Sequence, residues 1–319
     1  MKNCTVTCSN STNQDQVNIQ SDTEIFAVLM ITCAILGVCG NVLCVTVLSR
    51  VQQEVKGTRL LKLLSITEIF ALALCLMSKT LPDFISTRHI FAALEWCVSP
   101  LTFSVYTYEV YVTVLIAMQR ALALTMPLTF KRYLKNSTIN KTLIFLGVAS
   151  AGLSLPQWIA LCPELYFNQE LNRTWLHSSW NPFRTSYGYS VLYSGYATFI
   201  IQCFIPIVAL AVFNSCLIKS RIQMTKRSVI PNDKNNSKKL IIVVIAITSI
   251  SLLTHMISAV AKVCHENPYV TRLNDLFIVV KLSINFVFYT LFGRIFRASL
   301  LTACRITEPG DRSLGEQRI

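Results

Sequence analysis

Residues 25–49 read IFAVLMITCAILGVCGNVLCVTVLS, and no charged side chain interrupts them between Glu24 and Arg50. A helix rises about 1.5 Å per residue, so about 20 apolar residues cross the hydrocarbon core of a bilayer, which is about 30 Å thick. Six further apolar stretches follow at residues 60–82, 97–119, 142–162, 190–218, 240–261 and 275–293. The sequence therefore predicts an all-α fold, a bundle of seven transmembrane helices.

The composition of the 319-residue chain supports this assignment. Hydrophobic residues make up 53% of it and charged residues only 14%, whereas soluble domains carry about 25% charged residues. A buried helix of a soluble protein can also be apolar all round, but a soluble chain of this length does not offer seven of them. Residues 1–24 contain no hydrophobic signal segment, so we expect the first span to serve as both targeting signal and anchor.

Lysine and arginine are unevenly divided between the two sets of connections. Of 29 such residues, 21 lie in or beside the first, third and fifth connections and the C-terminal tail, and seven lie on the opposite side. The positive-inside rule places the basic side in the cytosol and the N-terminus outside. We therefore predict a multi-pass protein with an extracellular segment (1–24), a seven-span domain (25–293) and a cytoplasmic segment (294–319). The net charge of +13 then indicates the lipid bilayer, and not nucleic acid, as a partner.

Glycosylation sequons give this orientation partial support. Three of them fall on the predicted outer face, where acceptors can be used, at Asn3, Asn10 and Asn172. Three more fall on the predicted inner face, at Asn136, Asn140 and Asn235. The sequons alone therefore do not decide the orientation, and the prediction depends on the charges.

The end of the last stretch carries the most informative motif. The chain reads LSINFVFY at residues 282–289 and LFGRIFR at residues 291–297. These segments resemble the end of the seventh helix and the start of the membrane-lying eighth helix in rhodopsin-like G-protein-coupled receptors. Phe286 stands where the family has the proline of Asn-Pro-x-x-Tyr, a version similar to that of invertebrate FMRFamide-type neuropeptide receptors. Further matches follow the family order: Gly40-Asn41, Arg120 seven residues before Pro127-Leu128, Pro156 and Pro206.

The resemblance implies a plasma-membrane receptor that binds an extracellular ligand, a neuropeptide in the first instance, and activates a heterotrimeric G protein. It implies roles in activation and coupling for Asn41, Arg120, Pro127, Asn285 and Tyr289.

Two departures from the family pattern concern activation. The family's Asp-Arg-Tyr triplet is Gln119-Arg120-Ala121 here, so the acid that restrains the arginine is missing. The sixth span has neither proline nor a Phe, Tyr or Trp between Leu240 and Ala261, so the family's tryptophan toggle is missing as well. We therefore predict raised basal activity.

Two other functions stay open. A chemosensory receptor for small molecules would use the same fold, and the degenerate activation motifs favour it. An ion- or proton-coupled transporter would also use buried Glu and Lys, although internal repeats and broken Gly-rich helices are not evident. Ligand-dependent GTPγS binding indicates a receptor, whereas solute flux without it indicates a transporter. The sequence has no Gly-rich phosphate loop, zinc-type cysteine pairs or nucleophile–base grouping, so we expect no enzyme activity, cofactor or metal.

Three charged residues, Glu68, Glu109 and Lys281, lie well inside predicted spans. Each such charge costs about 2.5–3.5 kcal/mol on insertion scales, so these residues usually face the bundle interior and pair with one another. The resemblance places all three, with Asn285, where rhodopsin-like receptors hold a sodium ion. We hypothesise that the Lys281 ammonium takes the role of that ion and bridges the two glutamates. The alternative is a static ion pair that only holds the second, third and seventh helices together.

Two cysteine assignments also come from the resemblance. The family joins the top of the third helix to the second outer loop by a disulfide; Cys97 resembles the first partner and Cys162 is the candidate for the second. Cys304 follows a pattern of Phe292, Phe296 and Leu300 that is typical of a lipid-facing amphipathic helix, the expected eighth helix. Cys304 is therefore a candidate for palmitoylation, and a free cytosolic thiol is the alternative.

We expect a ligand pocket between the spans on the outer side. The candidates at inward, upper-helix positions and in the long loop of residues 163–189 are Thr102, Tyr106, Gln157, Trp180, Tyr193, Tyr196, His255 and Asn274. Aromatic residues near the outer boundary also form the interfacial belt of membrane proteins, which is the alternative explanation for them.

Overall fold

The computed structural model describes residues 13–50, 58–80, 88–126, 128, 130, 135–168, 173–227, 235–263 and 268–292. Within these residues, seven helical segments are long and apolar enough to cross a membrane: Ile25–Ser49, Arg59–Ser78, Trp96–Thr125, Asn136–Ala160, Gly188–Gln223, Ile241–Val263 and Tyr269–Leu291. Each of them overlaps one predicted apolar stretch. The predicted all-α bundle of seven transmembrane helices is confirmed.

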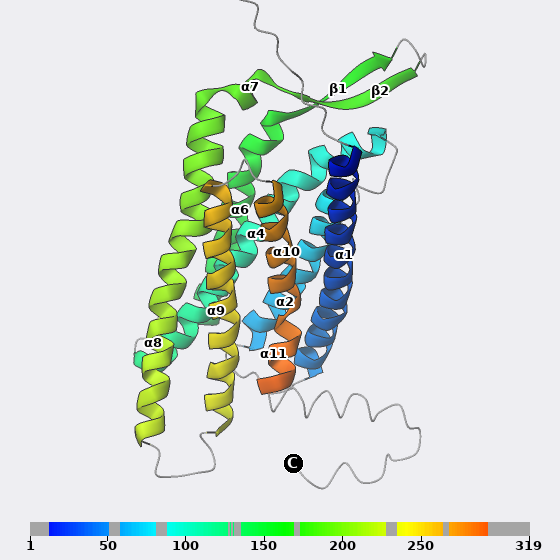
Figure 1. The fold of residues 1–319 in the computed structure, drawn as a ribbon. Coiled ribbons are helices and arrows are strands. Elements are labelled where there is room, and N and C mark those ends of the chain that lie inside the picture. The colour runs from blue at the N-terminus through cyan, green and yellow to red at the C-terminus, as the bar shows by residue number, and fades with distance from the viewer. Residues whose placement is uncertain are drawn as a thin grey trace, which may run out of the picture.

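The helices run up and down side by side (Figure 1). The first four crossings are α1 (Asn13–Arg50), α2 (Thr58–Cys75) with the π-helical turn η1 (Leu76–Thr80), α4 (Arg88–Thr125) and α6 (Asn136–Ala160). The fifth follows the short α7 (Pro182–Thr185) and consists of η2 (Gly188–Ala197), η3 (Ile200–Phe204) and α8 (Ile205–Arg227). The last two are α9 (Asn235–Val263) and α10 (Pro268–Ser283) with α11 (Asn285–Phe292). The expected eighth helix falls in residues 293–319, outside the described residues.

A β-hairpin connects the fourth and fifth crossings. Strands β1 (Leu161–Asn168) and β2 (Arg173–Trp180) are antiparallel, with Leu161 opposite Trp180 and Asn168 opposite Arg173. The sequence predicted a loop here, although the aromatic residues of the region favour strands. The hairpin lies at one end of the bundle (Figure 1), which we call the hairpin end.

The fifth crossing is mainly π-helical in the segment that precedes Pro206. Pro206 has no backbone N–H, so the Gln202 carbonyl four residues earlier loses its α-helical donor, and π-helix η3 occupies this position. Two hydrogen bonds join η3 to the third crossing. The Tyr111 hydroxyl donates to the Ile201 carbonyl at 2.9 Å, and the Gln202 side-chain amide donates to the Thr107 hydroxyl at 2.8 Å. The irregular helix is therefore anchored to α4.

The first and seventh crossings approach each other closely at two glycines of α1, Gly37 and Gly40. A β-carbon at Gly37 would lie 2.6 Å from the Ser283 β-carbon, and one at Gly40 would lie 2.8 Å from the Phe286 β-carbon. The Ser283 hydroxyl also lies 2.9 Å from the Cys33 carbonyl across this contact. The two glycines thus allow α1 to pack directly on α10 and α11.

The interior consists of two apolar regions separated by polar side chains. One apolar cluster, around Leu72, Val279 and Leu282, joins α1, α2 and α10. A larger one joins six of the crossings and contains Leu64, Val112, Leu115, Val244 and Tyr289. The outward surface is also apolar, since Phe70 is 61% exposed and Phe145 is 69% exposed, as expected of side chains that face lipid.

Candidate functional site

A buried ion pair connects the third and seventh crossings. The Lys281 ammonium donates to one carboxylate oxygen of Glu109, and both side chains are buried. The Thr113 hydroxyl lies 3.0 Å from the other Glu109 oxygen, one helical turn further along α4. The sequence predicted that these charges face the bundle interior and pair, and the geometry agrees with that prediction.

Glu68 has a different partner from the one we expected. Its carboxylate accepts a hydrogen bond from the Asn285 amide, and its second oxygen has no hydrogen-bond partner within the described residues. Glu68 still lies within electrostatic reach of Glu109 and Lys281. The predicted bridge is therefore present on one side only: Lys281 pairs with Glu109, and Asn285 binds Glu68. Helices α2, α4, α10 and α11 all contribute to this cluster, which we call the charge cluster.

The seventh crossing is interrupted inside the charge cluster. α10 ends at Ser283, Ile284 forms a turn and α11 begins at Asn285, although no proline is present. Here the Asn41 amide of α1 donates to the Leu282 carbonyl at 2.9 Å, which supplies an external partner to a carbonyl at the interruption. The interruption separates Lys281 from Asn285, so the two side chains belong to different helices.

A cavity of about 540 Å³ lies at the hairpin end. Four of the predicted pocket residues line it: Thr102, Tyr106, Gln157 and Asn274. Several lining residues were missed, namely Ser258 and Lys262 of α9, Gln202 and Cys203 of η3, Asp275 of α10 and Met30 of α1. Only the packing of their helices brings these residues together, and no motif marks them.

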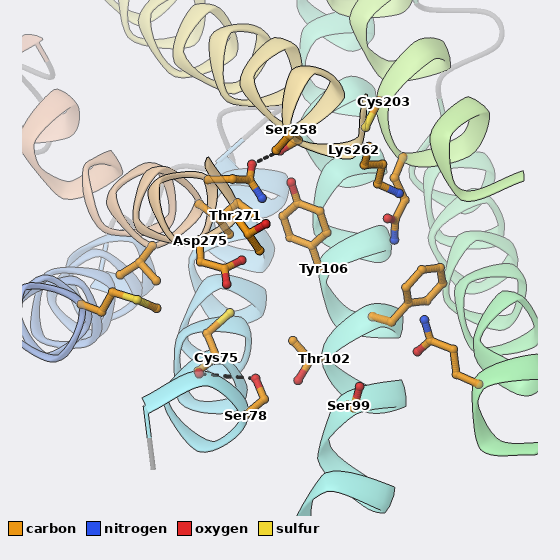
Figure 2. A pocket seen from close by; sticks show the side chains of 18 of the residues that line it. Cys75, Ser78, Ser99, Thr102, Tyr106, Cys203, Ser258, Lys262, Thr271 and Asp275 are labelled. Carbon is orange, nitrogen blue, oxygen red and sulfur yellow. Dashed lines mark hydrogen bonds between the residues drawn. The ribbon is translucent and has the colours of Figure 1, made fainter. Parts of the chain in front are cut away.

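Charged groups of both signs line the cavity. Figure 2 shows Asp275 and Lys262 on opposite sides of the Tyr106 ring. The Lys262 ammonium donates to the Thr198 hydroxyl at 2.9 Å, and the Ser258 hydroxyl donates to the Asn274 side-chain oxygen at 2.7 Å. A ligand in this space would therefore meet an acid, a base and several amide and hydroxyl groups.

The other four predicted pocket residues lie elsewhere. Tyr193 packs beside Phe103 and its hydroxyl donates to the Leu153 carbonyl, so its polar end is already bonded. Tyr196 lines a neighbouring cavity of about 720 Å³ that shares Phe103, Gln157, Gln202 and Lys262 with the first. His255 is buried and is not one of the residues that line the cavity. The side chain of Trp180 lies outside the described residues.

The cavity and the charge cluster adjoin each other. Tyr106 lines the cavity and precedes Glu109 by three residues on α4, so both lie on one helix face. Its ring centroid lies 6.3 Å from that of His255, whose ring nitrogens have no hydrogen-bond partner within the described residues. Val279 also lines the cavity, two residues before Lys281. The cavity and the buried pair are thus built from neighbouring turns of the same two helices.

Of the five residues that the resemblance assigned to activation and coupling, Asn41 and Asn285 lie at the charge cluster, and Arg120 and Tyr289 lie further from the hairpin end. Arg120 is half-buried, and one terminal nitrogen of its guanidinium has no hydrogen-bond partner within the described residues. Tyr289 belongs to the larger apolar cluster, and Gln119 is buried as well. The Thr248 hydroxyl of α9 donates to the Asn214 side chain of α8, which links the fifth and sixth crossings. Pro127 lies outside the described residues.

The predicted modifications remain predictions. Cys97 carries a free thiol, and the side chain of Cys162, the second residue of β1, lies outside the described residues, so the structure does not support the disulfide. Asn3, Asn10, Asn172 and Cys304 also lie outside the described residues. Among the residues that the structure does describe, no group of three His, Cys, Asp or Glu side chains could hold a metal ion.

A comparison of the sequence with models of known protein families and a comparison with curated proteins each find no match. The class of the protein therefore follows from its fold. The chain is a seven-helix, multi-pass membrane protein with a buried charge cluster and a polar cavity next to it.

Proposed function

We propose that the chain is a rhodopsin-like receptor of the plasma membrane, which binds an extracellular ligand in the 540 Å³ cavity and activates a heterotrimeric G protein at the opposite end. The observation that carries the proposal is the closeness of the cavity to the charge cluster along α4 and α10. Tyr106 and Val279 line the cavity, and Glu109 and Lys281 follow them on the same two helices. A ligand that moves α4 against α10 would therefore perturb a pair that holds these helices together.

The orientation follows from the distribution of positive charge. Of the 29 Lys and Arg residues, 21 lie in the tail or in and beside the connections opposite the hairpin end. The positive-inside rule assigns that side to the cytosol. The hairpin and the cavity then face the exterior, and Arg120 and the basic segment 219–239 face the G protein.

The ligand that fits best is the end of a peptide. The cavity falls within the range of about 300–1,000 Å³ that is typical of small-ligand sites, so it accommodates one terminus and not a whole chain. A peptide end presents a charged group and backbone amides, and the cavity offers Asp275, Lys262, Gln157 and Gln202 to them. A chemosensory receptor for small molecules would use the same cavity.

The test is a peptide-library screen against a promiscuous G-protein reporter, followed by GTPγS binding in membranes. A receptor gives ligand-dependent GTPγS binding, and Thr102→Trp, which fills the cavity, should abolish it. Thr32→Trp is the matched control, because Thr32 is a threonine at a lipid-facing position of α1 whose hydroxyl also bonds its own helix, at 2.8 Å against 2.7 Å for Thr102. Solute flux that Thr102→Trp blocks, without any GTPγS binding, would establish a transporter instead.

A further inference from the structure

A groove on the outer surface of the bundle is separate from the cavity. Its floor is α4, and its walls are α2 and α6, both of which pack against α4. It has two compartments, of about 540 Å³ and about 280 Å³. Ile66 and Tyr108 line both compartments, so the groove is continuous.

The two compartments differ in chemistry. The larger one, at the end opposite the hairpin, contains the cations of Arg59 and Lys62 and the amide of Asn140. Neither cation has a hydrogen bond or an ion pair within the described residues. The smaller compartment is lined mainly by apolar groups, and Phe70 is the α2 residue of its lining that is furthest along the chain from Arg59. The groove is therefore basic at one end and apolar along the rest.

The length of the groove matches one leaflet of a bilayer. Arg59 and Phe70 are 11 residues apart on α2, which corresponds to about 16 Å along the helix axis. The hydrocarbon core is about 30 Å thick, so one leaflet occupies about half of it. A chain that starts at the basic end would reach the midplane near Phe70.

We propose that this groove binds one phospholipid with an anionic headgroup, which lies with its phosphate between Arg59 and Lys62 and an acyl chain along Tyr108 and Gly147. Charge complementarity selects this occupant, because a sterol offers only a hydroxyl group to the two cations. The site is independent of the proposed receptor function, since it faces lipid whatever the protein transmits.

Native mass spectrometry of the purified protein, titrated with phosphatidylserine, phosphatidylcholine or cholesterol, tests the headgroup. Each basic residue near an anionic surface contributes about 1 kcal/mol, so Lys62→Ala should weaken phosphatidylserine binding roughly fivefold and Arg59→Ala/Lys62→Ala roughly thirtyfold. Lys219→Ala is the matched control, because it removes an exposed lysine at the same end of the bundle from α8, away from the groove. It should bind phosphatidylserine like the wild type.

A second pair of variants tests the acyl chain. A β-carbon at Gly147 would lie 3.8 Å from the Tyr108 ring, so Gly147→Leu fills the groove without changing any charge. A β-carbon at Gly152, also on α6, would meet nothing within 4 Å. We expect Gly147→Leu to lose phosphatidylserine and Gly152→Leu to retain it.

A measurement on the wild type removes any dependence on how the variants fold. Phosphatidylserine with a diazirine at its acyl chain end should label α2 or α6 near Phe70 or Gly147. Labelling elsewhere would overturn the proposal. Equal retention of phosphatidylcholine, preferential retention of cholesterol, or an equal loss in Lys219→Ala would overturn it as well.

Discussion

Removal of the Lys281 charge should strongly destabilise the protein. Lys281→Met keeps the length and the apolar stem of the side chain but leaves Glu109 buried without its cation. Lys281 is 3% exposed and Glu109 is fully buried, so solvent cannot replace the lost partner. Loss of one member of a buried ion pair costs about 3–5 kcal/mol. For the 319 residues of this chain, that corresponds to a fall of roughly 4–8 °C in the thermal midpoint.

Two further variants separate the charge effect from a packing effect. In Lys281→Met/Glu109→Gln the unpaired charge is gone, and the glutamine oxygen can still accept from Thr113, so most of the lost stability should return. Glu68→Gln is the control for the second acid, since it keeps an acceptor for Asn285 and removes a carboxylate that has no direct cation. Its thermal midpoint should equal that of the wild type or exceed it.

Buried cysteine thiols of the protein can report its thermal unfolding. Cys44 and Cys203 are free and buried, so a thiol-reactive dye becomes fluorescent as the bundle unfolds. If Lys281→Met unfolds at the same temperature as Glu68→Gln, or if the double variant is no more stable than Lys281→Met, then the pair does not carry the stability that its burial implies.

Three other outcomes are expected. Gly37→Ala should destabilise the protein by about 1–3 kcal/mol because its β-carbon would collide with α10, whereas thermal unfolding of Gly152→Ala should show no loss, since the added methyl group meets open space. Gln119→Glu should lower ligand-independent second-messenger production because it supplies an acid next to Arg120; wild-type activity equal to empty vector, despite surface expression, would contradict the prediction of raised basal activity. Ligand affinity should be the same in sodium and choline buffers, because the Lys281 ammonium already neutralises Glu109. A large sodium-dependent shift in radioligand binding would contradict the hypothesis that Lys281 takes the role of the sodium ion.

The seven crossings could be predicted because each depends only on local composition. A run such as residues 25–49 is apolar for its whole length, and the cost of burying a charge in lipid makes such runs unambiguous. The β-hairpin was missed because the pairing of residues 161–168 with residues 173–180 depends on register and turn geometry, which leave a weaker pattern. The interruption at Ile284 was also not predicted, because it involves a hydrogen bond between the Asn41 amide and the Leu282 carbonyl, which are 241 residues apart in the sequence.

The candidate site, too, could be predicted only in part from the sequence. The buried charges could be found because ionisable residues are rare inside spans and therefore conspicuous. Their partners could not, because Glu68 had two possible donors, and only the packing of α2 against α10 and α11 selects Asn285 over Lys281. Asp275 and Lys262 were missed as cavity residues because they lie near span ends, where charges are common and carry no signal.

The separation of Glu109 and Lys281 by 172 residues has a consequence for biogenesis. The translocon must release the second and third crossings, with both of their acids, long before the ribosome has made the lysine that neutralises one of them. Every intermediate of membrane insertion therefore carries an uncompensated acid, and only arrival of the last crossing completes the bundle. Nascent chains that stop short of Lys281 should be recognised and degraded by the quality-control machinery of the membrane in which they are made.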